Sequence, residues 1–266
     1  MDKLITWGAI AAPYFIAIPI AIFGAQHFIY LQFVADFIPA WIPWRTFWAC
    51  FTGVALMSAA VGIVFRLWNR QAATWLGTMI FLWVVLLHTS RIAAKPTDFG
   101  EWRGIFQALS MSGCAFALAG FLRQQRQPQD VRESVPALDG RLAPWFIGVA
   151  MTALGAEHYI FATDANAQVP LWLPANAPSN YLCGTVLILL GVGICIPRTR
   201  RNASALLGLA ILLSMLFVHL PIALRSTHFE SDWTKTFMMS AGAFLLAAIS
   251  ERRSPVPAES VPVLAR

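Results

Sequence analysis

Residues 24–29 read Gly-Ala-Gln-His-Phe-Ile, and residues 155–160 read Gly-Ala-Glu-His-Tyr-Ile. A second pair of related stretches follows, Ile-Pro-Ala-Trp-Ile-Pro at 38–43 and Val-Pro-Leu-Trp-Leu-Pro at 169–174. Both pairs have the same offset in numbering (155 − 24 = 169 − 38 = 131). The same ungapped register pairs further prolines, glycines, histidines and tryptophans within residues 13–102 with later positions. This pattern predicts an internal duplication, in which one structural unit occurs twice along the chain.

The 266-residue chain is 58% hydrophobic and only 12% charged, and its mean hydropathy is +0.63. Because soluble domains carry about 25% charged residues, these figures indicate a polytopic membrane protein whose main partner is the lipid bilayer. The net charge of +6 comes from arginines in short loops, so we expect no nucleic-acid partner. The sequence contains no catalytic triad, metalloprotease motif, P-loop or dinucleotide fingerprint, which argues against a hydrolase, an NTPase or a nicotinamide enzyme.

Apolar segments long enough for a membrane-spanning helix, which needs about 20 residues, occur eight times along the chain. The predicted fold class is therefore all-α, with eight transmembrane helices arranged as two parallel four-helix repeats. The predicted helices cover residues 13–30, 46–65, 71–89, 103–122, 144–162, 179–196, 203–224 and 233–250. The predicted domains are a first membrane unit at 1–122, a cytoplasmic linker at 123–143, a second membrane unit at 144–250 and a disordered tail at 251–266.

The Lys and Arg residues are distributed unevenly over the predicted loops, with 13 of the 19 on one side of the membrane. Since these residues favour the cytoplasmic side, both termini are predicted to be cytoplasmic. Each unit has an even number of spans, so both copies keep the same orientation. Pro144 is expected to be the first residue of its helix, where proline is favoured. The matching helix near the N-terminus is then a permanent span and not a cleaved signal peptide.

Polar and charged residues gather near the predicted outer ends of the helices, at a similar depth in both units. Ionisable groups inside a membrane are costly and usually face the bundle interior, so they are candidate site residues by default. The candidate ligand-binding residues of the first unit are Gln26, His27, His88, Arg91, Glu101 and Trp102. Those of the second unit are Glu157, His158, His219, Arg225, Asp232 and Trp233.

Three interpretations of these residues are open. Imidazoles and a carboxylate can hydrogen-bond the carbonyls of a quinone-like head group and relay a proton. Two imidazoles on separate helices can instead ligate a haem iron or a transition metal. In the third interpretation the histidines only hydrogen-bond across helices and stabilise the bundle. The cofactor is therefore unassigned between quinone and haem, and no metal-ligating set is predicted.

The Pro-x-Trp-x-Pro segments at 39–43 and 170–174 are not expected to form regular helix, because each proline removes a hydrogen-bond donor. Their Trp and aliphatic side chains suit the lipid headgroup layer. We expect these segments to anchor the outer ends of the units, and a lid over a bound substrate is the alternative. Glycines such as Gly53, Gly62 and Gly77 are expected to permit close contact between helices.

The four-helix unit resembles the DoxX/DoxD-like superfamily of small bacterial membrane proteins. The motifs that carry the resemblance are Gly24-x-x-His27-Phe28, Ile38-Pro39-x-x-Ile42-Pro43, Gly53 followed by Gly62, and Leu87-His88, with their copies in the second unit. The resemblance implies a four-helix unit in the bacterial inner (plasma) membrane, of the kind found in subunits associated with thiosulfate:quinone oxidoreduction and in many relatives of unknown role. Typical members have one unit where this chain has two. Many also carry a Glu just after the glycine of the second helix, where this chain has Ala55-Leu56 and Val186-Leu187.

Three classes of function follow from these observations. The first is a redox-associated subunit that contacts a quinone or lipid-like small molecule near the outer leaflet. The second is a small-molecule transporter or carrier with a path between the parallel repeats. The third is a non-catalytic scaffold for a membrane or periplasmic partner protein. The sequence leaves open whether the chain is an enzyme.

Overall fold

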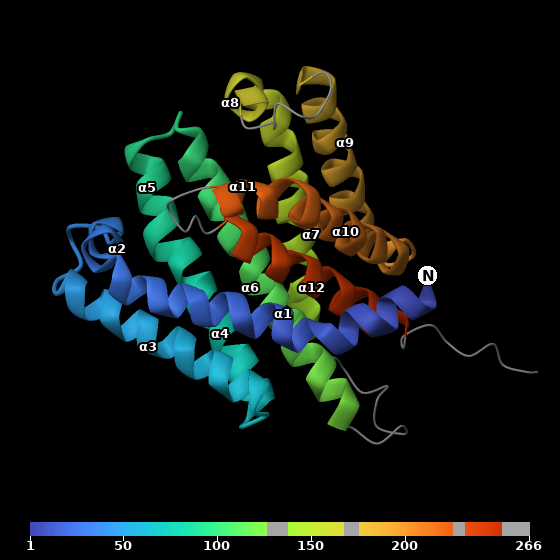
Figure 1. The fold of residues 1–266 in the computed structure, drawn as a ribbon, viewed down its shortest axis with the longest axis horizontal. Helices are drawn as coiled ribbons and strands as arrows, with labels where there is room; N and C mark the ends of the chain where they lie inside the picture. The colour runs from blue at the N-terminus through green and yellow to red at the C-terminus, as the bar shows by residue number, and fades with distance from the viewer. Residues whose placement is uncertain (127–137, 168–175, 226–231, 252–266) are drawn as a thin grey trace, which may run out of the picture.

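The structure is a computed structural model that describes residues 1–126, 138–167, 176–225 and 232–251. At positions 126, 138, 139, 167, 176, 223, 225, 232–234 and 251 it describes the backbone alone. All the regular elements in these ranges are helices, so the predicted all-α fold class is confirmed for the described part of the chain (Figure 1). The predicted tail and the second Pro-x-Trp-x-Pro segment lie outside the described residues.

The helices follow one another in the same order in the two halves of the chain. The first half contains α1 (Asp2–Ile29), α2 (Leu31–Phe37), α3 (Arg45–Val64), α4 (Asn69–Trp83), the π-helical segment η1 (Val84–His88), α5 (Thr89–Ala94) and α6 (Phe99–Arg126). The second half contains α7 (Leu138–Ile160), α8 (Ala162–Ala167), α9 (Asn176–Cys195), α10 (Arg200–Ser214), the π-helical segment η3 (Met215–His219), α11 (Leu220–Arg225) and α12 (Asp232–Glu251).

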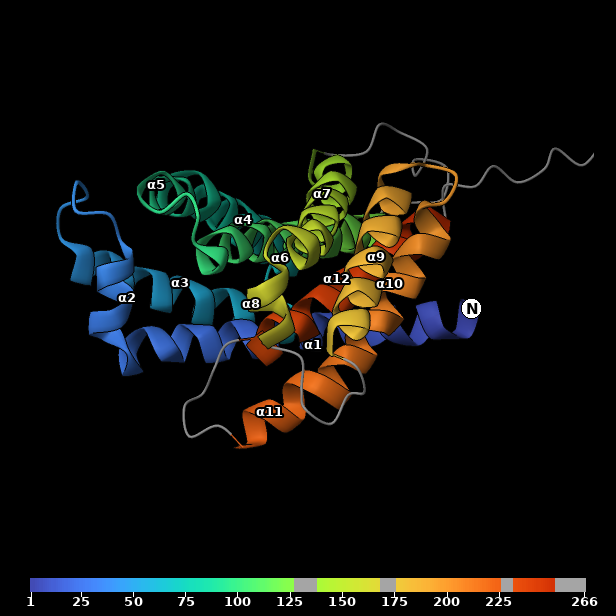
Figure 2. The ribbon, with the colours of Figure 1, turned by 90° about the horizontal axis from the view of Figure 1, so that it is seen from above.

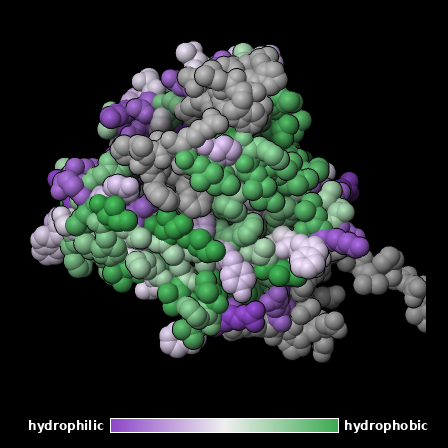
Figure 3. Space-filling view, in the orientation of Figure 1, coloured by the Kyte–Doolittle hydropathy of each residue, from purple (hydrophilic) through white to green (hydrophobic). Residues whose placement is uncertain are grey.

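Six described helical segments are long and apolar enough to cross a membrane, which is consistent with a membrane protein. They are Asp2–Ile29, Arg45–Val64, Asn69–Ala94, Phe99–Gln125, Ala177–Cys195 and Arg200–Ile222. A shorter apolar helix, Lys235–Ser250, lies within α12. On the visible face, hydrophobic residues form a broad area between hydrophilic residues at the upper left and at the lower and right edges (Figure 3).

Two exposed tryptophans mark the ends of α3. Trp44 precedes this helix and is 77% exposed, and Trp68 follows it after a short turn and is 81% exposed. The 20 residues of α3 give a length of about 30 Å, which equals the hydrocarbon thickness of a bilayer. Tryptophans are enriched at both membrane interfaces, so their positions agree with a helix that crosses the bilayer.

The two ends of the helical bundle carry different elements. The short helices α2, α5 and α8 lie toward the left and the top of Figure 1, whereas the N-terminus and the end of α6 lie toward the right and the bottom. We call the first of these the α5 end and the second the opposite end. The α5 end corresponds to the side on which the sequence placed the outer loops.

Two predicted helix starts are wrong. α1 begins at Asp2 and contains Pro13 in its interior, and α7 begins at Leu138, so Pro144 is not its first residue. Apolar and buried residues upstream of each proline, such as Ile5 in α1, continue the helix toward the N-terminus. Each proline removes one intrahelical hydrogen bond, and the packed residues on both sides hold the helix together.

The end of one third span was also predicted too early. The helix that contains His88 continues through α5 to Ala94, beyond the predicted end at 89, whereas the one that contains His219 ends at Arg225, next to the predicted end at 224. Both histidines therefore lie six residues, about 9 Å, before the helix end. Of the four repeated histidines, His27 and His158 lie in the last turn of a helix, whereas His88 and His219 lie more than one turn before a helix end.

α6 is the central helix among the candidate spans. Of its apolar window 78% is buried, against 22–39% for the other five. It packs on α4, α7 and α12, while α12 also packs on α10 and α1. Figures 1 and 2 show α1 and α3 side by side, as the contacts between them require. The first helix of each half thus lies against the fourth helix of the other half, so the halves are interlocked rather than separate bundles.

The first three helices of the two halves correspond at the predicted spacing. α3 and α9, α4 and α10, and the two π-helical segments all begin at the same offset (176 − 45 = 200 − 69 = 215 − 84 = 131). At the α1–α3 crossing, a Cβ atom on Gly53 would lie 3.1 Å from the carbonyl oxygen of Gly24. At the α7–α9 crossing, a Cβ on Gly184 would lie 2.8 Å from that of Gly155. The prediction that these glycines permit close helix contact is confirmed.

The fourth helices correspond at a different spacing. The Ser112 hydroxyl donates to the carbonyl of Gly77 at 2.7 Å, and the Ser240 hydroxyl donates to the carbonyl of Gly208 at 2.8 Å. The offset between the glycines is 208 − 77 = 131, but the offset between the serines is 240 − 112 = 128. The second half therefore has three fewer residues before this contact.

The ungapped register of 131 residues pairs Glu101 with Asp232 in the sequence, and this shift changes that pairing. Glu101 lies 112 − 101 = 11 positions before Ser112, whereas Asp232 lies 240 − 232 = 8 positions before Ser240. The three-residue difference corresponds to about 4.5 Å along a helix. Position 232 is thus nearer to its serine contact than position 101 is, so the two acidic residues do not correspond in this alignment.

Candidate functional site

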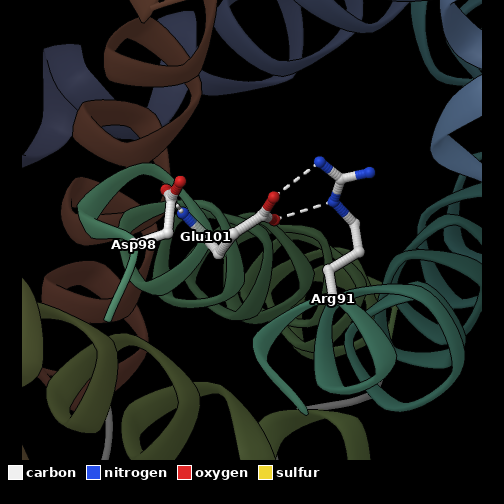
Figure 4. Close-up of polar contacts among 3 residues, drawn as sticks. All are labelled: Arg91, Asp98 and Glu101. Atoms are coloured by element: carbon white, nitrogen blue, oxygen red, sulfur yellow. Dashed lines mark hydrogen bonds and ion pairs between the residues drawn. The ribbon is translucent and has the colours of Figure 1, made fainter. Parts of the chain in front are cut away.

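An ion pair between α5 and α6 is the centre of the candidate site. Arg91 Nε donates to Glu101 Oε2 at 2.7 Å, and Arg91 Nη2 donates to Glu101 Oε1 at 2.6 Å (Figure 4). The side chains are 25% and 8% exposed. This two-point geometry uses the planar fork of the guanidinium and fixes the position of both groups. The sequence predicted both residues as site residues, and the structure brings them together.

The start of α6 holds Glu101 in place. The backbone N–H of Glu101 donates to Asp98 Oδ1 at 3.1 Å, so the Asp98 side chain caps the helix (Figure 4). The sequence Asp-x-x-Glu has the spacing of a capping box, in which the glutamate normally turns back to the cap residue. Here the Glu101 carboxylate is instead bonded to Arg91, so the cap positions the acidic partner of the ion pair.

Phe37, the last residue of α2, links Arg91 with His88. The Arg91 guanidinium carbon lies 3.6 Å from the centroid of the Phe37 ring, which is a close cation–π contact. The same ring also contacts His88, with ring centroids 6.4 Å apart and planes at 70°. α2 therefore covers the site with an aromatic ring that contacts its cation and its imidazole.

His88 is the last residue of the π-helical segment η1. Its Nδ1 atom is buried and has no hydrogen-bond partner among the described residues. The ring packs on the backbone of α6, where a Cβ on Gly104 would lie 3.3 Å from Nδ1 and from Cε1. π-Helical turns are rare and occur often at functional sites. His219 likewise ends η3, so both halves place a histidine at the end of such a segment.

A lysine from the second half extends the polar group. Lys235 of α12 donates to Gln107 Oε1 of α6 at 2.8 Å. The charges of Lys235, Arg91 and Glu101 all act on His88. The site therefore combines an imidazole, a guanidinium, an ammonium and a carboxylate. Such a set can donate hydrogen bonds to carbonyl oxygens and accept one from a hydroxyl group.

The second half has a different arrangement at the end of α7. The His158 Nδ1 atom lies 2.5 Å from Asn180 Oδ1, and Asn180 Nδ2 donates to the His158 carbonyl at 2.9 Å. Glu157 is only 5% exposed, and its Oε1 has no hydrogen-bond partner within the described ranges. Arg103 of α6 interacts with this carboxyl group electrostatically. Glu157 and His158 thus form a second polar cluster, between α6, α7 and α9.

The matching residues of the first half are arranged otherwise. His27 Nδ1 donates to the Phe23 carbonyl at 2.7 Å, and its ring stacks on Trp83 at a centroid distance of 6.4 Å. Position 49, which corresponds to Asn180, is a buried alanine. Gln26 is partly buried in the last turn of α1. The two repeated histidines, His27 and His158, therefore have different partners.

The other predicted residues either make structural contacts or have side chains outside the described part of the structure. Trp102 donates its indole N–H to the Pro96 carbonyl at 2.8 Å and stacks on Phe106, so it connects the α5–α6 turn to α6. His219 is partly buried. The side chains of Arg225, Asp232 and Trp233 lie outside the described residues, although their backbone is helical. Within the described ranges, no group of three or more His, Cys, Asp or Glu side chains could hold a metal ion.

Six contributors to the two clusters were missed in the sequence. Asp98 and Arg103 could have been found as charges next to the predicted start of a span. Lys235 and Gln107 could have been found as polar residues inside predicted spans, and a charged residue there is a site candidate by default. Asn180 carried the same signal as a polar residue inside a span. Phe37 carried none, since an aromatic residue after an apolar helix is common in membrane proteins.

Comparison with known proteins gives one finding. Residues 147–244, from α7 into α12, match the model of a family described as a domain of unknown function (DUF8561). No curated protein and no solved structure matches the chain. The resemblance to the DoxX-like family stays a prediction.

Proposed function

We propose that the chain is an integral protein of the bacterial inner membrane, of the DoxX-like type, with eight spans in two parallel four-helix repeats. The shared offset of three helix starts supports the duplication, and the paired serine contacts of α6 and α12 extend it to the fourth helices. α7 and α12 complete the eight spans. The charge bias of the loops supports cytoplasmic termini, which makes the α5 end the periplasmic side.

The proposed function is binding of the polar head group of a quinone or similar lipid-like molecule at the α5 end, as part of a redox-associated subunit. One observation carries it: the half-buried Arg91–Glu101 pair lies beside His88, whose Nδ1 lacks a partner among the described residues. A buried polar atom without a hydrogen bond is costly unless a ligand or water satisfies it. A quinone carbonyl accepts hydrogen bonds, and a quinol hydroxyl donates one, so both match an imidazole beside a guanidinium.

The test uses the full-length protein in detergent, titrated with a short-chain ubiquinone while tryptophan fluorescence is followed. We expect H88A and R91Q to weaken binding about tenfold or more, since each removes a hydrogen-bonding group from the site. S90A is the matched control, because Ser90 lies in the same helix and donates only to the Leu86 carbonyl. The proposal is wrong if the wild-type protein does not bind, or if H88A and R91Q bind like S90A. A visible spectrum and a lipid extract of the purified protein would also reveal haem or endogenous quinone.

A second candidate function is transport between the halves. The observation that favours it is the Lys235–Gln107 hydrogen bond, which joins α6 and α12 at the contact between the proposed repeats. Transporters built from repeats have their substrate sites at such a contact. Uptake of a labelled quinone analogue into vesicles that is lost in K235M, with binding retained, would favour transport over a redox-associated role.

A further inference from the structure

A groove lies between α3 and α4 at the opposite end of the bundle, remote in sequence from the Arg91 site. It has a volume of about 520 Å³. The residues of the groove used below are Ala55, Ser58, Ala59, Gly62, Trp68 and Trp75. Four of these six residues are small and lie on α3, whereas Trp68 directly precedes α4 and Trp75 lies within it.

The shape and lining of the groove suit a hydrocarbon chain. α3 and α4 approach closely at its end, where a Cβ on Gly62 would lie 3.1 Å from the Ala72 side chain. On the N-terminal side of Gly62, the small side chains of α3 leave space between the helices. Trp68 and Trp75 are 81% and 71% exposed and border the groove on α4. An apolar channel open to the bilayer is filled by lipid, because burying apolar surface is favourable and water finds no polar partners there.

Two arginines are next to lining residues of the groove. Arg66, in the α3–α4 turn, and Arg70, in the first turn of α4, are adjacent in sequence to the lining residues Leu67 and Gln71. Neither arginine forms an ion pair within the described part of the chain. Two unpaired guanidinium groups beside an apolar groove match a phosphate attached to an acyl chain.

The matching positions of the second half carry larger side chains on α9. At the offset that relates α3 to α9, Ala55, Ser58 and Ala59 are replaced by Val186, Leu189 and Leu190. Side chains of this size would fill the space that is open between α3 and α4. Positions 199 and 206, which match the two tryptophans, are threonine and leucine. The lining by small residues and tryptophans is thus a property of the first half.

We infer that this groove binds one anionic phospholipid, with an acyl chain between α3 and α4 and the phosphate at Arg66 and Arg70. The lipid comes from the leaflet that faces the opposite end of the bundle. This site is independent of the Arg91 site, so either proposal can fail without the other.

The test measures lipid binding to the delipidated full-length protein by native mass spectrometry, with phosphatidylglycerol and phosphatidylcholine as probes. We expect one phosphatidylglycerol to bind at least tenfold more tightly than phosphatidylcholine. S58L/A59L, which introduces the leucines of the second half, should bind phosphatidylglycerol about tenfold more weakly than the wild-type protein. R66Q/R70Q should bind both lipids alike. The matched controls are V54L/V61L, at two exposed positions of α3, and R198Q, in the α9–α10 turn.

Each outcome decides the inference. It is overturned if the wild-type protein binds both lipids equally, or if folded S58L/A59L binds phosphatidylglycerol as V54L/V61L does. Circular dichroism and size-exclusion chromatography establish folding. If S58L/A59L does not fold, R66Q/R70Q decides alone, because Arg66 lies in the α3–α4 turn and Arg70 in the first turn of α4. Unchanged lipid selectivity in that variant, relative to R198Q, would then overturn the inference.

Discussion

Lys235 of α12 donates a hydrogen bond of 2.8 Å to Gln107 of α6, so a charged side chain joins the fourth helices of the two halves. The offset between them, 235 − 107 = 128, is the one that also relates Ser112 to Ser240. In the proposed repeat arrangement they occupy corresponding positions, and their contact is then expected near a twofold axis between similar units. The packing of α6 on α12 therefore both interlocks the halves and places a polar group between them.

Removal of one partner of the Arg91–Glu101 pair should strongly destabilise the protein. R91Q leaves a carboxylate buried without its cation, and we expect a loss of about 3 kcal/mol in the free energy of unfolding. R91K should lose less, because it keeps the charge but not the two-point geometry. The double variant R91M/E101M should be close to wild type. Unfolding by SDS, followed by tryptophan fluorescence, measures these differences. R198Q is the control, and an R91Q loss no larger than that of R198Q would contradict the prediction.

The paired serine contacts should be equivalent in energy. S112A and S240A each remove a buried hydrogen bond to a glycine carbonyl, which should cost about 1 kcal/mol in either half. The same SDS unfolding assay compares them with S90A, whose hydroxyl bonds within its own helix. If one serine variant is neutral while the other is clearly destabilised, the proposed correspondence of the fourth helices does not hold.

Close helix crossings should make two glycines intolerant of a methyl group. G53A and G184A place a Cβ within 3.1 Å and 2.8 Å of a carbonyl oxygen on the facing helix. Overpacking of this kind costs about 1–3 kcal/mol. G100A is the control, because that position is exposed and the Cβ would have only Asp98 Oδ1 within 3.2 Å. The melting temperature in detergent should fall for the two crossing variants and stay constant or rise for G100A. Equal melting temperatures for all three would show that the crossings can adjust.

Membrane orientation can be tested with single cysteines in a variant whose four native cysteines are replaced by alanine. K95C lies at the α5 end and R198C in the α9–α10 turn, and both positions are exposed. A membrane-impermeant maleimide should label K95C in spheroplasts, and R198C only after permeabilisation. The reverse pattern would place the termini in the periplasm.

The sequence was a good guide to the apolar segments, because hydropathy and the cost of an unsatisfied backbone in lipid act locally. It predicted the α3 and α9 helices within a few residues of their observed bounds. It could not predict that α6 packs on α7 and α12 on α1. Lipid-facing and helix-facing surfaces are both apolar, so the pattern does not reveal which faces meet.

Prediction of the site was incomplete for similar reasons. Arg91 and Glu101 could be found as charges near helix ends, but their pairing depends on the extension of the third span to Ala94. The equivalence of Glu101 with Asp232 failed because an ungapped register was carried past a three-residue difference. His27 and His158 share a motif, yet their partners differ because Asn180 has no polar counterpart in the first half.

The π-helical segments that end at His88 and His219 each hold one residue more than an α-helical turn would. Because the wide turn absorbs this residue, the helix beyond it keeps the rotation of a regular α-helix that is one residue shorter. Deleting one residue from Val84–Leu87 should therefore convert the segment to α-helix and leave Arg91 facing Glu101. The π turn thus gives this span room for one change in length that an unbroken α-helix lacks.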